Sequence, residues 1–239
     1  MNKVVQNTTG KFESEHVASE YKYPSEYKPK PLAEQMRILR KEFTGIEHVT
    51  GNLDANYSAP GADGAFLIPR FETFSPSYNE ALKMLLDKLE KRYDGNFYNY
   101  QKYSFGKGEL RQSVRSENAW RRLGRKQKSN VILLPAQTGI KYRGHSTRLS
   151  REKFAHNEFG LGAFAGGIIL LTHPERFPEF VEDNNDLWID FAGDEYAPDA
   201  DGVFSCAPVF RFRKKQLEFD FRRTNIAAVS YGSASAFTQ

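Results

Sequence analysis

The residues best suited to chemistry form a basic segment in the middle of the chain. Between Lys102 and Lys153 there are fourteen Lys or Arg and three Asp or Glu, a net charge of +11. Cations gathered on one surface bind phosphate groups, and aromatic rings beside them stack on single-stranded bases. The pattern predicts a nucleic-acid- or phosphate-binding surface. Its residues are Arg111, Arg115, Arg121, Arg122, Arg125, Lys126, Lys128, Lys141, Tyr142 and Arg143.

An acidic block follows the basic segment. From Glu175 to Asp201 there are ten Asp or Glu and one Arg, a net charge of −9. Hard cations such as Mg²⁺ bind several carboxylate oxygens, so a metal-dependent hydrolase or nuclease that uses residues 182–201, with Asp190 and Asp194 as ligands, is one alternative. A solvated acidic surface explains the same residues, and we predict no metal site and no cofactor. If the acidic and basic blocks instead contact each other, the charge argument for a partner weakens.

The first thirty-one residues form a polar arm with a distinct tyrosine-rich end. Three prolines between Tyr21 and Pro31 fix the backbone and predict an extended conformation. Tyr21, Tyr23 and Tyr27 are candidates for docking onto a protein partner or a neighbouring subunit, which would make this a structural or assembly protein. The arm has few apolar groups, so we expect residues 1–31 to bury little area and residues 32–239 to form a single domain.

The remaining motifs give little support for catalysis. The glycine cluster Gly160–Gly167 lacks the spacing of a dinucleotide motif, which also needs a strand before it and a helix opening at it. The residues before it suggest a helix, so close backbone packing explains the glycines better. Cys206 lies in an apolar context that suits an inert buried thiol. Five scattered histidines and one cysteine do not make a zinc site. We therefore expect an accessory protein that is not an enzyme.

The elements that must position these residues alternate irregularly between helix and strand. That arrangement predicts an α+β fold with a mixed or antiparallel sheet, several packed helices and a C-terminal hairpin. Ser77 with Glu80 and Ser146 are expected to cap helices. The expected helices are Leu32–Phe43, Pro76–Tyr93, Glu109–Leu123 and a segment from Ser146 to His156. The expected strands are Phe66–Ile68, Phe97–Tyr103, Val131–Leu134, Leu187–Phe191, Val209–Arg213 and Leu217–Phe221.

The register of the C-terminal hairpin follows from whether its apolar residues have odd or even numbers. Phe210 and Phe212 have even numbers, whereas Leu217, Phe219 and Phe221 have odd numbers. Opposite residues in an antiparallel pair share a face of the sheet, so only an odd sum of their numbers puts all five on one side. We predict an odd register with the apolar face buried and the charged face exposed.

No segment suits a membrane or an export signal. The longest apolar run, Phe159–Leu171, is too short to cross a bilayer, and the first residues hold no apolar stretch. A single cysteine permits no intramolecular disulfide. A cytoplasmic protein without membrane contact is expected.

Overall fold

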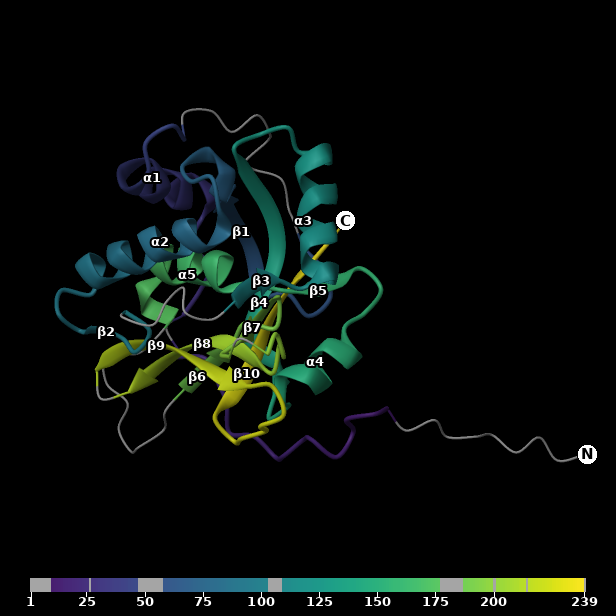
Figure 1. Cartoon of the computed structure of the whole chain (residues 1–239). Helices are drawn as coiled ribbons and strands as arrows, with labels where there is room; N and C mark the ends of the chain where they lie inside the picture. Colours follow the sequence, from purple (N-terminus) through teal and green to yellow (C-terminus); the bar gives the residue numbers. More distant parts are fainter. Residues whose placement is uncertain are drawn as a thin grey trace, which may run out of the picture.

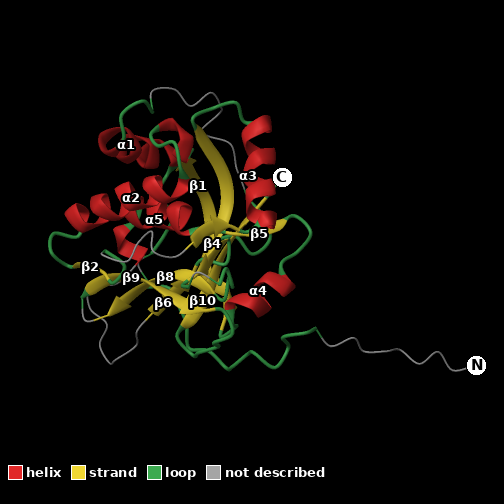
Figure 2. Cartoon of the chain, viewed as in Figure 1, coloured by secondary structure: helices red, strands yellow, loops and turns green. Residues whose placement is uncertain are grey.

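The computed structural model describes residues 10–25, 27–46, 58–102, 109–176, 187–199, 201–213 and 215–238. They form an α+β fold in which helices pack on a mixed sheet (Figures 1 and 2). The helices are α1 (Leu32–Glu42), α2 (Tyr78–Arg92), α3 (Val114–Lys126), α4 (Thr147–Lys153) and α5 (Ala163–Thr172), with short 3-10 turns η1 (Phe71–Thr73) and η2 (Pro174–Arg176). The strands are β1 (Gly64–Pro69), β2 (Phe97–Asn99), β3 (Glu109–Gln112), β4 (Val131–Arg143), β5 (Glu158–Gly160), β6 (Leu187–Asp190), β7 (Asp194–Ala197), β8 (Cys206–Arg213), β9 (Gln216–Arg223) and β10 (Tyr231–Phe237).

The sheet is joined at its centre by the strand that comes last in the chain. Its order is β1-β4-β10-β6-β8-β7-β3, with β9 paired to β8 and β2, and β5 paired to β10. Strand β10 runs antiparallel to β4 on one side and parallel to β6 on the other. It therefore connects the β1–β4 pair to the part of the sheet that contains β6, β7, β8 and β9.

The glycine cluster lets a fully buried helix approach the sheet. Every residue of α5 is buried, and a Cβ on Gly166 would lie 1.8 Å from the Phe191 ring. Close packing therefore accounts for this glycine, as the sequence predicted. The local context differs from the expected one, because the short strand β5 precedes the glycines and α5 opens at Ala163.

The C-terminal hairpin has the odd register expected from parity. Phe210 lies opposite Phe219, and Arg211 lies opposite Glu218. The two phenylalanines are fully buried, as predicted, but Arg211 and Glu218 are only 8% and 7% exposed. The expectation of an exposed charged face is wrong, because Trp188 covers it, with its ring centre 4.5 Å from the Arg211 guanidinium carbon.

The helix expected over 109–123 is instead a strand followed by a helix. Residues 109–112 form β3, which pairs antiparallel with β7. Ser113 ends the strand and caps α3, because its hydroxyl accepts a hydrogen bond from the Ser116 amide. Arg111 therefore lies on a strand, while the other arginines expected in this helix and just after it, Arg115, Arg121, Arg122 and Arg125, lie on α3.

The N-terminal arm packs against the domain. Tyr21 and Tyr27 are buried, and the rings of Tyr21, Tyr23 and Tyr27 surround the Arg176 guanidinium at 5.6, 4.1 and 5.6 Å. Arg176 is fully buried and donates hydrogen bonds to the Tyr21 hydroxyl and to the Thr138 carbonyl oxygen, at 2.6 and 2.9 Å. The expectation that the arm buries little area is wrong, because a cation at the sheet supplies partners for its rings.

Two glycines at the end of β4 leave room for the arm. A Cβ on Gly139 would lie 2.5 Å from the Tyr21 hydroxyl oxygen, and one on Gly144 would lie 2.2 Å from the Val17 carbonyl oxygen. Both glycines have positive φ, 129° and 74°, which other residues rarely adopt. The arm therefore packs directly against the backbone of these two glycines, where any side chain would collide with it.

Polar contacts hold the arm along its length. Glu15 forms an ion pair with Arg148, and Lys30 forms one with Glu175. The Lys30 amide donates to Nε2 of the buried His173 at 2.9 Å. Burial lowers the pKa of His173 to about 4, so its ring is neutral and can accept this bond. Residues 1–9 and 26 of the arm lie outside the described residues.

None of the helices described here has the length and apolar character needed to cross a membrane.

Candidate phosphate and nucleic-acid interface

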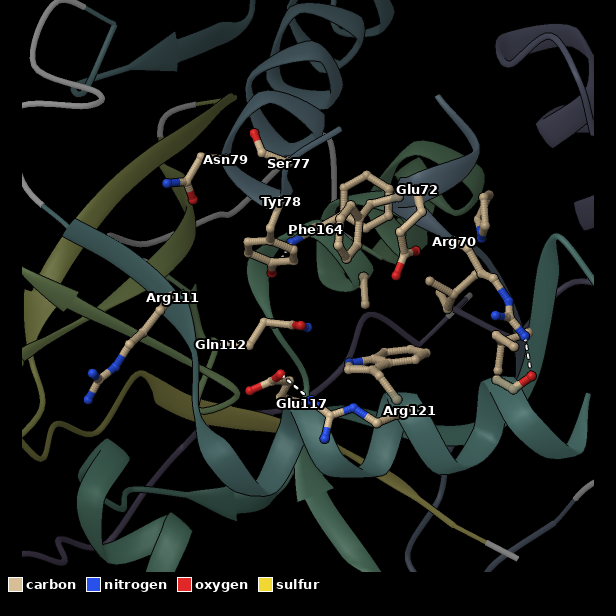
Figure 3. A pocket seen from close by; sticks show the side chains of 18 of the residues that line it. Arg70, Glu72, Ser77, Tyr78, Asn79, Arg111, Gln112, Glu117, Arg121 and Phe164 are labelled. Atoms are coloured by element: carbon tan, nitrogen blue, oxygen red, sulfur yellow. Dashed lines mark hydrogen bonds and ion pairs between the residues drawn. The ribbon is translucent and has the colours of Figure 1, made fainter. Parts of the chain in front are cut away.

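A cavity of about 880 Å³ opens between α3 and the first turns of α2 and α5. Glu117 and Arg121 extend from α3 on one side, and Tyr78 and Phe164 face them from α2 and α5 (Figure 3). Arg111 of β3 lies toward one end of the cavity and Arg70 toward the other. The lining residues lie at positions 68–79, 110–132 and 162–165, so three separate stretches of the chain contribute to one hollow.

Four aromatic residues contribute to the lining of the cavity. Phe71, Tyr78, Trp120 and Phe164 line it. The Phe71 and Tyr78 rings meet edge-on with centres 5.6 Å apart, and Tyr78 and Phe164 are 6.3 Å apart. These rings offer flat apolar surface, which suits a planar ligand.

Behind the cavity, the carboxylate of Asp194, the first residue of β7, caps the N-terminus of α5. Oδ2 of Asp194 accepts hydrogen bonds from the Ala163 amide and the Tyr78 hydroxyl, both at 2.7 Å. The Phe164 amide donates to the same Tyr78 hydroxyl at 3.3 Å. A Cβ on Gly162 would lie 2.4 Å from Oδ1 of Asp194, so glycine is needed there. The first amides of α5 are thus occupied by side chains of this chain.

Three arginines of the predicted surface line the cavity: Arg111, Arg121 and Arg125. Arg111 forms an ion pair with Glu195 at 3.0 Å and stacks on the Phe204 ring. Arg121 forms an ion pair with Glu117 of the same helix. For Arg125, which is exposed, no ion pair appears within the described part of the chain.

The other cations of α3 point elsewhere. Arg115 donates to the carbonyl oxygens of Glu158 and Ala155, so its guanidinium holds the chain near β5. Arg122 and Lys128 are exposed, and neither forms an ion pair with any described residue. Lys126 is also exposed, at the end of α3. The cations of the predicted binding surface therefore do not share one face. Some line the cavity, Arg115 makes an internal contact, and the others extend into solvent.

The basic turn of β4 belongs to a different region. Lys141 forms an ion pair with the buried Glu158 at 2.6 Å, and the Tyr142 hydroxyl donates to the same carboxylate at 2.7 Å. Tyr142 is 4% exposed, whereas Arg143 is exposed. The structure does not bring Lys141, Tyr142 and Arg143 to the cavity.

The acidic and basic blocks contact each other. Strand β3 of the basic block pairs with β7 of the acidic block, and Arg111 and Arg151 both approach Glu195. Arg151 also donates to the carbonyl oxygens of Ala192 and Asp194, at 2.9 and 2.6 Å. Some charges of the basic block are therefore paired with charges of the acidic block within the chain.

The acidic block contains two buried carboxyl groups. Burial raises the pKa of Asp190 and of Asp194 to about 7, and Arg151 partly opposes this shift. No group of three or more His, Cys, Asp or Glu suited to a metal ion occurs within the described part of the chain. Glu182, Asp183 and Asp186 of the block lie outside it.

The tyrosines that the sequence predicted to dock on a partner pack against their own domain. Tyr21, Tyr23 and Tyr27 face Arg176 and do not line the cavity. Their docking onto another chain stays a prediction.

Sequence reasoning did not identify the residues that make the cavity. Phe71, Tyr78, Trp120 and Phe164 belong to no pattern that points to a site, and Asn79 and Gln112 belong to no motif. Apolar rings at helical spacing usually indicate core, so the sequence offered no signal that these rings surround a hollow.

Comparisons with protein-family models, curated proteins and solved structures gave no match to this chain. The functional argument therefore rests on the geometry of the site.

Proposed function

We propose that the protein binds nucleic acid through the phosphate groups of a strand that crosses α3 beside the cavity, as an accessory protein and not as a catalyst. The observation that carries the proposal is the meeting of Arg111, Arg121 and Arg125, from a strand and a helix, at one aromatic-lined cavity. Cations beside aromatic rings are the combination that single-strand binding requires.

The exposed cations on α3 and just after it support the same proposal. Arg122, Arg125 and Lys128 are exposed and make no ion pair among the residues described. Their charge is available to phosphate oxygens, whereas that of Arg111 is partly satisfied by Glu195. The phosphate contacts should therefore come mainly from α3 and the residues that follow it.

The test is a salt titration of oligonucleotide binding. Replacing Arg122, Arg125 and Lys128 by Gln should weaken binding to all sequences and reduce the slope of log K against log salt, by about 0.7 for each lost contact to a single strand. The control replaces Lys83, Lys91 and Arg92 on the exposed side of α2, which removes the same charge. An intact protein that does not bind DNA or RNA at low salt would refute the proposal.

Assembly through the arm is a second candidate, supported by the close packing of the arm on Gly139 and Gly144. The arm of a second copy would make the same contacts as the chain's own arm if the two copies exchanged arms. Light scattering tests this candidate. Exchange of arms predicts a dimer, and a monomer at every concentration would exclude it.

A further inference from the structure

The cavity beside α3 contains an amide that its own chain does not satisfy. The Gln112 side chain extends from β3 toward the space between Tyr78 and Glu117 (Figure 3), and no described group bonds to it. The Asn79 amide points away from this space (Figure 3). A ligand that carries a donor and an acceptor on one edge can bond both polar atoms of the Gln112 amide.

The size and lining of the cavity match a planar aromatic ligand. Its volume of about 880 Å³ lies in the range of small-molecule sites, which are mostly apolar with a few convergent polar groups. Trp120 and Phe71 contribute half-buried rings to its lining, and the Gln112 amide provides both a donor and an acceptor. Amide side chains can form paired hydrogen bonds with the edge of a base.

Positive charge at the opening suggests what the planar ligand is attached to. Arg121 and Arg125 of α3 line the cavity, and Arg122 and Lys128 lie beyond it on the same part of the chain. A ligand with a ring in the cavity would place an attached group against these cations. An anionic attachment such as phosphate fits this position by charge.

We propose that the cavity receives one unstacked nucleobase, with Gln112 bonding its edge and its phosphate held at Arg121 and Arg125. The inference rests on the proposed function and adds a base-binding subsite to the phosphate contacts. A strand would bind with its phosphates along α3 and one base turned inward. Base stacking would then contribute to affinity independently of charge.

Fluorescence of Trp120 reports directly on the cavity. The chain has two tryptophans, and Trp188 lies on the hairpin away from the cavity. In the Trp188→Phe variant, an oligonucleotide should quench Trp120 saturably. The same oligonucleotide with abasic sites keeps every phosphate but offers no base, so it should bind about ten- to a hundredfold more weakly and quench little.

A blocking variant tests whether the base enters the cavity itself. Val114 lines the cavity and is 70% exposed, so Val114→Trp should fill the opening without disturbing the core. In this variant the intact and abasic oligonucleotides should bind equally. Val203→Trp is the matched control, since Val203 is 56% exposed and does not line the cavity.

Each outcome separates the subsite from the phosphate contacts. Salt-dependent binding that is equal for intact and abasic strands would retain the proposed function and overturn the subsite. If no strand binds, a nucleoside monophosphate that quenches Trp120 in the Trp188→Phe protein would retain the subsite without the proposed function. Absence of quenching by every one of these probes would overturn the subsite.

Discussion

The N-terminal arm and helix α3 are both rich in charged and aromatic residues, but the fold uses them differently. In the arm, three tyrosine rings, Glu15 and Lys30 all contact groups of their own domain. On α3, Arg115 is used internally, while Arg122 and Arg125 are exposed and make no ion pair with a described residue. The comparison shows that charged composition does not reveal which polar groups are already satisfied within the chain.

The largest effect should come from removing a ring of the arm. Replacing Tyr21 by Ala removes a buried ring and the hydroxyl that accepts from Arg176. We expect a loss of about 3–5 kcal/mol in the free energy of unfolding, measured by urea denaturation. Tyr98→Ala is the control, because Tyr98 is 50% exposed. Equal stability of the two variants would mean that the arm is not part of the core.

A second effect should appear in the pH dependence of stability. Asp194 has a pKa of about 7 in the folded chain and 3.8 in its ordinary state. Between these values the folded chain binds more protons than the unfolded chain, so this carboxyl lowers the free energy of unfolding as pH rises from about 4 to 7. Asp194→Asn keeps an acceptor for Ala163 and Tyr78 and should remove this part of the slope.

Denaturation at several pH values measures the difference between the two proteins. The stability of the wild type relative to Asp194→Asn should fall across that interval and become constant above it. A difference that does not change with pH would show that Asp194 titrates near its ordinary pKa. Asp190→Asn should behave in the same way, because burial also raises its pKa to about 7.

The smallest effects distinguish the arginines of α3 from one another. Arg115→Gln should lower stability by about 1 kcal/mol, because it loses hydrogen bonds to the Glu158 and Ala155 carbonyl oxygens. Arg122→Gln should change stability by less than about 0.5 kcal/mol, since its side chain is exposed. Thermal denaturation of both variants gives the comparison. A larger loss for Arg122 would show that it too is used internally.

Local patterns predicted most elements, and long-range contacts explain the errors. Ser77 and Ser146 cap helices as expected, and the hairpin register followed from side-chain parity. The α+β class was also predicted correctly. The strands β5, β7 and β10 were not predicted, because their short or small-residue sequences carry no alternation. Their pairing depends on partners far away in the chain.

The candidate site was predicted only in part for the same reason. Arg111, Arg121 and Arg125 were identified from charge, but helical periodicity grouped Arg111 with α3 although Ser113 begins that helix. Neither the cavity nor the burial of Tyr21 could be read from the sequence. Both depend on which surfaces meet, and Tyr21 contacts a residue 155 positions away.

The central position of β10 has a consequence for how the chain folds during synthesis. The pair β1–β4 and the group β6–β9 emerge first, and each must wait for residues 231–237 before its inner edge is covered. Exposed strand edges pair readily with other chains, so partly synthesised molecules have two surfaces prone to aggregation. A truncation within β10 should therefore yield insoluble protein, even though it removes no more than the nine residues 231–239.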